Sequence, residues 1–208
     1  RASVHNEDII KKLDIRIGDM VYVEKGGEII PKIVGVNTDV RQPETKEIEF
    51  IKNCPSCGTE LVRKEGEAHH YCPNENGCEP QIIGKLEHFV SRKAMDIDSI
   101  GGETAVLIHK AGLLNNIADF YTIQKEDILP LDRMAEKSAQ NIINSVEKSK
   151  EQPFEKVLYA IGIRHVGETV AKKLVKHFQT IDRLINATTA ELVSVTDVGE
   201  KIAISIKE

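Results

Sequence analysis

A five-residue pattern that occurs four times between residues 97 and 199 limits the possible folds of this chain more than any other feature of its sequence. Each copy has an aliphatic residue, two variable residues, an apolar residue and a small residue, and consecutive copies start 34, 32 and 32 residues apart. An alanine follows the apolar residue by five positions, and a large aliphatic residue follows it by eight. A fixed period of this length predicts a repeated helical unit, because each unit needs its neighbours to bury its apolar face. The copies are Ile97–Gly101, Leu131–Ala135, Ile163–Gly167 and Val195–Gly199.

The expected unit is two helices joined by a tight hairpin, with the apolar residue as a plug between them. The alanine lets the helices pack closely, and the small residue lets another backbone approach or, as glycine, adopts unusual dihedral angles. The first amide N–H groups of the second helix have no partner inside that helix, and they point outward at the positive end of its dipole. Such a tip binds phosphate and reads no bases. The repeats therefore predict binding to the backbone of double-stranded DNA.

The pattern resembles the helix-hairpin-helix family, whose hairpin holds Gly-apolar-Gly. The first glycine is replaced by Ser99, Arg133, His165 and Asp197. Ala135 replaces the second glycine in the second copy, which predicts the weakest backbone contact with phosphate in that copy. The third copy is expected to make the strongest contact. An aspartate in the fourth copy stands where phosphate should lie. The expected DNA contacts are Gly101, Arg133, Lys137, Arg164, His165, Gly167, Lys172 and Gly199. The alternative is that these hairpins only pack against one another.

The net charge of −5 is unusual for a nucleic-acid-binding protein, which normally presents a basic face. The charge is unevenly distributed, since residues 156–183 hold six Lys or Arg against two acids, a local +4, and residues 184–208 hold two Lys against four acids, a local −2. We therefore expect modest, salt-sensitive affinity. Aromatic residues make up 4% with no Trp, which argues against a single-strand binder that stacks bases. No apolar run approaches the about 20 residues that span a bilayer, so no membrane association is expected.

All four cysteines lie in one short segment, as a Cys-x2-Cys pair and a Cys-x5-Cys pair. Thiolate pairs at such spacings suit tetrahedral zinc, and four sulfurs leave no position for a reactive water, so the zinc would be structural. The rival interpretation is two disulfides. His69 and His70 are interpreted as surface residues of the loop between the pairs. The predicted zinc ligands are Cys54, Cys57, Cys72 and Cys78.

The segment before the cysteines carries strand signals. Partly alternating residues 19–24 and β-branched residues 28–34 flank a Gly-Gly turn, and Asn6 is placed to cap a preceding helix. One hairpin cannot close a core, so we interpret the segment as the end of a small β-barrel. The predicted fold class is multi-domain α+β: a partial OB-fold β-barrel at 1–50, a four-cysteine zinc knuckle at 51–80, and an all-α domain of four repeats at 81–208, the last one truncated.

This order of parts resembles the C-terminal half of bacterial NAD-dependent DNA ligase, and the resemblance covers essentially the whole chain. It implies an OB-fold ending near residue 50, a structural zinc module, and a repeat domain that grips the minor groove and backbone of nicked duplex DNA. It also implies DNA contacts at Lys25, Ile29 and Ile30. Relatives often carry Arg at the position of Lys25, and lysine keeps the charge but cannot form the two parallel hydrogen bonds of a guanidinium group. The motifs are Arg1–Asn6, Arg16–Asp19, Gly27–Pro31, the cysteine spacing, Ser91–Asp96, Lys137–Asn141 and Ala160–Glu168.

In that family the chemistry proceeds through a lysine adenylate in a Lys-x-Asp-Gly motif, fed by a domain that takes up NAD. No Lys-x-Asp-Gly and no glycine-rich phosphate loop occurs here. The resemblance therefore implies a fragment of an enzyme that seals nicks in replication and repair, inactive by itself, with NAD and Mg bound outside it by a missing N-terminal adenylation domain. It also implies a monomer in the bacterial cytoplasm, associated with the nucleoid.

Three other functions stay open at this stage. A non-ligase DNA-structure binder, such as a module of a repair protein, would use the same repeats. A repair glycosylase would place a Gly/Pro-rich loop and a catalytic Asp after a single hairpin, whereas here the hairpins repeat. A protein–protein adaptor with a zinc knuckle would not bind DNA even at low salt.

Overall fold

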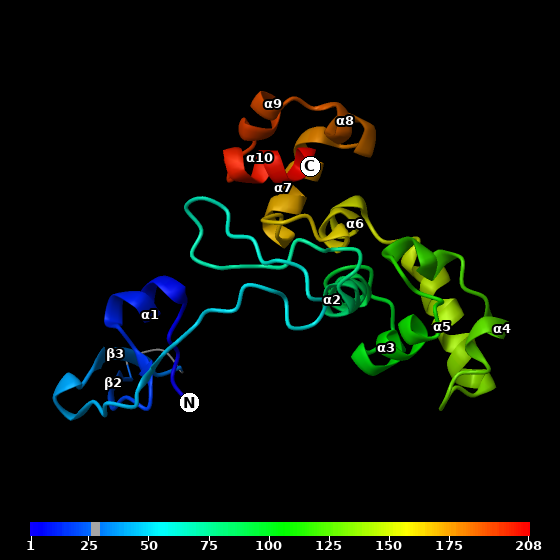
Figure 1. Ribbon diagram of the computed structural model, residues 1–208. Coiled ribbons are helices and arrows are strands. Elements are labelled where there is room, and N and C mark those ends of the chain that lie inside the picture. The colour runs from blue at the N-terminus through cyan, green and yellow to red at the C-terminus, as the bar shows by residue number, and fades with distance from the viewer. Residues whose placement is uncertain (26–29) are drawn as a thin grey trace. The chain divides into compact units, whose positions relative to one another are not determined.

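The computed structural model describes residues 1–25 and 30–208 (Figure 1). They form two compact units, Arg1–Cys78 and Glu79–Glu208. The first is made of short strands and loops with a single α-helix, and the second is helical throughout. None of the helices among the described residues is both long enough and apolar enough to cross a membrane.

The first unit starts with helix α1, which begins where the sequence predicts. The side chain of Asn6 accepts a hydrogen bond of 3.1 Å from the backbone N–H of Ile9, and the helix ends at Asp14 with a left-handed φ of 47°. Two antiparallel strand pairs follow, β1 with β4 and β2 with β3. The elements are α1 (Glu7–Leu13), β1 (Arg16–Ile17), β2 (Val21–Glu24), β3 (Lys32–Val36), the 3-10 helix η1 (Thr38–Val40) and β4 (Lys46–Glu47).

The predicted partial OB-fold β-barrel is represented by short strand pairs. The strand pairs form two separate two-stranded sheets, and residues 1–25 and 30–78 contain no closed barrel. The predicted hairpin does form, with its second strand beginning at Lys32; residues 26–29 lie outside the described part of the chain. The small sheets bury little apolar surface, since Ile17 of β1 is 66% exposed and Tyr22 of β2 is 56% exposed. Two such short strand pairs cannot close a barrel, which agrees with the partial barrel that the sequence predicts.

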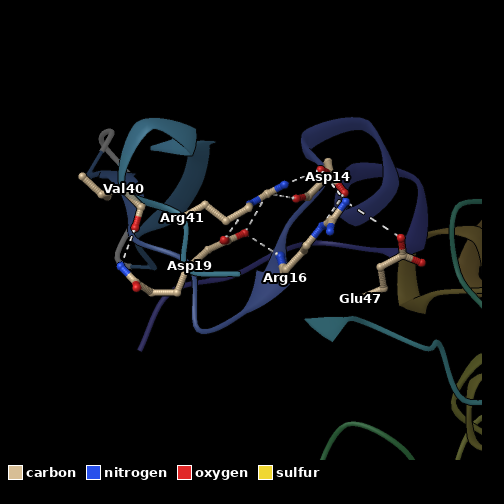
Figure 2. Close-up of polar contacts among 7 residues, drawn as sticks. Asp14, Arg16, Asp19, Val40, Arg41 and Glu47 are labelled. Atoms are coloured by element: carbon tan, nitrogen blue, oxygen red, sulfur yellow. Dashed lines mark hydrogen bonds and ion pairs between the residues drawn. The ribbon is translucent and has the colours of Figure 1, made fainter. Parts of the chain in front are cut away.

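A network of charged side chains ties this unit together instead (Figure 2). The Asp19 side chain is fully buried, and its carboxylate accepts two hydrogen bonds of 2.9 Å from the Arg41 guanidinium and one of 2.7 Å from the backbone N–H of Arg16. Arg41 also donates to Asp14 at the end of α1, at 2.6 Å. Hydrogen bonds from Arg41 lower the pKa of both Asp19 and Asp14. Arg41 therefore links the α1 end, the β1–β2 turn and the segment after η1.

Replacing Arg41 with Gln should loosen this unit, because it leaves the buried Asp19 carboxylate without its cation. The pKa of Asp19 is lowered in the folded state, so the pair contributes stability above the unfolded pKa of about 4, and that contribution is lost as the pH falls through the folded pKa. We expect R41Q to reduce protection of the Arg16 amide against hydrogen exchange at neutral pH and to flatten the loss of protection below about pH 4. Unchanged protection in R41Q, relative to the exposed control variant K12Q, would contradict the assignment.

The second unit consists of helices around two apolar clusters. The first cluster runs from Leu86 to Ala160, the second from Leu158 to Ala203, and α6 contributes to both. All four alanines of the repeat pattern have no exposed surface, as their predicted role between closely packed helices requires. The helices are α2 (Glu79–Val90), α3 (Gly102–Lys110), η2 (Ile117–Tyr121), α4 (Lys125–Ile128), α5 (Glu136–Ser149), α6 (Phe154–Ile161), α7 (Glu168–Phe178), α8 (Ile181–Asn186), α9 (Thr189–Val193) and α10 (Glu200–Lys207).

Candidate nucleic-acid interface and metal centre

The four cysteine side chains meet at one point of the first unit. Their sulfur atoms all lie within 4.8 Å of one another, with 3.9 Å between Cys54 and Cys78 and 3.5 Å between Cys57 and Cys72. Zinc–sulfur bonds of about 2.3 Å in a tetrahedron place sulfurs about 3.8 Å apart, so the set fits zinc. A disulfide needs about 2.05 Å, and none of the four cysteines is disulfide-bonded in the structure, which excludes the disulfide interpretation.

The surroundings of the sulfurs favour metal binding. Hydrogen bonding to Thr59 lowers the pKa of Cys57 to about 6, and burial raises the pKa of Cys72 to about 12. These opposite shifts are expected of packed thiols, because the first thiolate to form disfavours the next, and a divalent cation relieves that repulsion. The turn that presents the first pair is closed by a 2.9 Å bond from the Gly58 N–H to the Cys54 carbonyl.

The two histidines of the intervening loop do not join the sulfur cluster. His69 is exposed, as predicted. His70 is half-buried: its ring contacts Phe50, with 4.9 Å between ring centroids, and its Nε2 lies 3.4 Å from a carboxylate oxygen of Glu7. The prediction of a surface residue was thus wrong for His70, because the loop folds back onto α1. Arg63 makes the same connection through hydrogen bonds to Asp8, one of them 2.9 Å long.

The four pattern copies adopt one backbone conformation, and we number them as hairpins 1 to 4 in chain order. In each, the residue before the plug is left-handed, with φ of 70°, 60°, 67° and 68° at Ser99, Arg133, His165 and Asp197. The residue after the plug is the N-cap of the next helix, with φ between −80° and −98°. These helices are α3, α5, α7 and α10.

This geometry corrects two sequence-based expectations. The unusual dihedral angle does not fall on the small residue after the plug, whose extended backbone any residue can adopt; it falls on the residue before the plug. Ala135 (φ −98°) therefore takes the same conformation as Gly167 (φ −80°), and hairpin 2 is not distorted. The plugs hold the hairpins in place: Ile100, Val166 and Val198 are buried, and Met134 is half-buried.

The N-termini of the four hairpin helices are open. No side chain caps α3, α5, α7 or α10, and the same is true of α6 after Pro153. By contrast, the side chains of Asn6, Thr180 and Thr188 cap α1, α8 and α9. A Cβ atom built on Gly101, Gly167 or Gly199 would meet nothing within 4 Å. The hairpin tips, by which we mean these N-cap residues and the first turns after them, therefore present unpaired amide groups to open space.

The predicted charged contacts lie around these tips. Arg133, Lys137, Arg164, His165 and Lys172 are all exposed. Lys172 bonds to Glu168 at 2.7 Å. In the first unit, Lys25 is exposed and Ile30 is 62% exposed, whereas Ile29 lies outside the described residues.

Two arrangements around the tips were not visible in the sequence. Asp197 of hairpin 4, expected to repel phosphate, pairs with the amino group of Lys173 on α7. The two residues are 24 positions apart, so no local spacing signals the pair. Hairpins 1 and 2 face a common cavity of about 380 Å³, lined by Ser99, Arg133 and Ser138 among others. The tips of two hairpins are thus brought to one place.

Removing the metal should act on the first unit only. We expect a chelator to abolish slowed amide exchange at Cys54, Gly58 and Cys78, because metal binding is the main source of folding free energy for a segment with little core. The helical unit keeps its two apolar clusters, so the far-ultraviolet circular dichroism should change little. A collapse of helical signal on chelation would contradict the division into two units, and intact exchange protection would contradict the structural role of the metal.

Comparison with known protein families identifies three segments. Residues 1–45 match the NAD-dependent DNA ligase OB-fold domain, and residues 53–79 match the NAD-dependent DNA ligase C4 zinc finger domain. Residues 156–208 match the helix-hairpin-helix motif, a range that includes hairpins 3 and 4. The ligase-specific zinc-finger match covers the four cysteines that meet in the structure.

Related proteins named DNA ligase match along the whole chain. Identity is 60% over 208 residues with that of Christiangramia forsetii, 59% over 208 residues with that of Flavobacterium johnsoniae, and 58% over 206 residues with that of Bacteroides fragilis. These matches cover 99–100% of this chain and 31% of each relative. From end to end, the chain thus matches proteins named DNA ligase, and it carries the OB-fold and C4 zinc-finger domains of NAD-dependent DNA ligase together with a helix-hairpin-helix motif.

Proposed function

We propose that this chain is the part of an NAD-dependent DNA ligase that grips duplex DNA at a nick. The proposal rests on the shared geometry of the four hairpins. Each is followed by a helix whose N-terminus has no side-chain cap. We infer that all four are helix-hairpin-helix units, including hairpins 1 and 2, which precede the matched range 156–208. Four such tips on one helical unit suit a ligand with regularly repeated phosphates.

The glycines at the tips support this role. Since a Cβ there would meet nothing in the chain, the fold itself does not need glycine at these positions. The open space around these glycines lets a phosphate approach the amide groups and the positive end of the helix dipole. At Ala135 a methyl group takes up this room, so hairpin 2 relies more on Arg133 and Lys137, both exposed.

Such contacts bind DNA without regard to sequence, because amide groups on phosphate oxygens carry no base information. Arg164, His165 and Lys172 add charge around hairpin 3, and we propose Lys25 and Ile30 as contacts from the first unit. The logarithm of the binding constant should fall linearly with the logarithm of the salt concentration, and the slope should be proportional to the number of phosphates neutralised. The zinc has a structural part in this scheme: it orders the cysteine segment and touches no substrate.

The grip serves catalysis through positioning. Sealing a nick requires the 3′-hydroxyl in line with the activated 5′-phosphate, and holding two reactants in place supplies a large share of the rate. The sequence contains no Lys-x-Asp-Gly. We therefore propose that a separate adenylation domain uses NAD and Mg, and that this chain alone joins no nicks. We also propose that the chain acts as a cytoplasmic monomer. The ligase-specific OB-fold and zinc-finger matches favour this function over a non-ligase repair module.

A pair of opposite substitutions tests the grip. Gly167→Val should lower the affinity for a nicked duplex by roughly tenfold, equivalent to about 1.4 kcal/mol, because its side chain blocks the tip of hairpin 3. Ala135→Gly should raise the affinity, because it opens the tip of hairpin 2. Fluorescence anisotropy on duplexes of several sequences measures both, and circular dichroism checks that each variant stays folded. Equal affinities for both variants and the parent chain, or a strong preference for one sequence, would overturn the proposal.

A further inference from the structure

A second charged surface lies beside the tip of hairpin 3. A cavity of about 530 Å³ opens between the loop after α2, the first turns of α6 and the first turn of α7. All three segments belong to the helical unit Glu79–Glu208. We call this cavity the basic groove. Its charged lining residues are Arg92, Lys93, Glu155, Lys156, Glu168 and Lys172.

The four cations of the groove come from segments far apart in the sequence, and the fold brings them together. The Lys156 amino group donates to the backbone carbonyl of Arg92 at 3.5 Å, which places two of the basic residues side by side. Lys93 is 75% exposed and Lys172 58% exposed, so both are accessible from solvent. Four cations against two carboxylates leave a net charge of +2 in a protein whose net charge is −5. A concave surface of one charge concentrates ions of the opposite charge.

Glu168 is the internal counter-ion of the groove. One of its carboxylate oxygens lies 2.7 Å from the Lys172 amino group, and the other lies 3.9 Å from the Lys93 amino group. Lys172, and to a smaller extent Lys93 and Lys156, lower the pKa of Glu168. The carboxylate is therefore ionised at neutral pH and forms ion pairs with two of the four cations.

Glu168 is also the first residue of α7, directly after Gly167 at the tip of hairpin 3. A phosphate that binds the first amide groups of α7 arrives next to this carboxylate. The two anions repel each other and compete for the same lysines. The groove and the hairpin tip are thus two parts of one surface, with Glu168 between them.

We propose that the basic groove binds a further backbone phosphate of the duplex held by hairpin 3. In the absence of DNA the Glu168 carboxylate pairs with Lys93 and Lys172, and the phosphate replaces it as their partner when DNA binds. The proposal rests on the proposed DNA grip and names new contacts for it: Arg92, Lys93 and Lys156. It also gives Glu168 a function, which is to weaken binding. A carboxylate at this position keeps the affinity low enough for the protein to leave one site and move to another.

The test uses two substitutions with opposite expected effects in the zinc-loaded 208-residue chain. Glu168→Gln frees Lys93 and Lys172, so the affinity for a nicked duplex should rise roughly three- to tenfold, with a salt dependence steeper by about one unit. Lys156→Gln removes a phosphate contact, so affinity should fall by a similar factor and the salt dependence should become shallower by about one unit. Anisotropy titrations between about 50 and 200 mM salt measure both quantities.

Matched controls separate the groove from general charge effects. Glu147→Gln and Lys148→Gln make the same charge changes at exposed positions of α5 outside the groove, and they should change affinity less than twofold, a change of about 0.4 kcal/mol. If E168Q and K156Q act no more strongly than these controls while Gly167→Val still weakens binding, the groove proposal is wrong and the hairpin grip stands. If Gly167→Val also has no effect, both fail.

Discussion

The structure depends on one property of the α-helix: the first amide groups have no partner within it. Helices α1, α8 and α9 satisfy theirs with the side chains of Asn6, Thr180 and Thr188. The four hairpin helices have no such cap, and three of them start at a glycine around which there is open space. A helix end without a side-chain cap gives up the stability that such a cap would add, and at the hairpins these ends lie at exposed tips that a ligand can reach. Phosphate is the ligand that suits them best.

The rest of the helical unit keeps these ends in place. The alanines of the pattern have no exposed surface, which lets the paired helices approach closely, and the plugs fill the space under each turn. The left-handed residue before each plug turns the chain sharply enough for the next helix to start at once. Charged side chains then adjust the tips: Lys173 neutralises Asp197 beside hairpin 4, and Glu168 occupies Lys93 and Lys172 beside hairpin 3.

The sequence predicted what depends on spacing along the chain. The cysteine pairs, the Asn6 cap and the buried alanines are all of this kind, because a metal knuckle, a helix start and a helix–helix contact each need residues at fixed local distances. The left-handed conformation of Ser99 and Arg133 could not be predicted, since neither residue favours it and only the surrounding hairpin imposes it. Pairs such as Asp19 with Arg41, 22 positions apart, appear only when the chain is folded. The pairing of β1 with β4 could not be predicted either, because Arg16 and Glu47 lie far apart in the sequence.

If the hairpin tips hold duplex DNA, their amide groups must contact it directly. A titration of the isotopically labelled chain with duplex DNA, followed by amide chemical shifts in NMR spectra, addresses it most directly. We expect saturable shifts for the amides of Gly101, Gly167 and Gly199 and of the residues that follow them, independent of the DNA sequence, and little change at the capped starts of α8 and α9. Saturable binding that leaves those three glycine amides unshifted would contradict it.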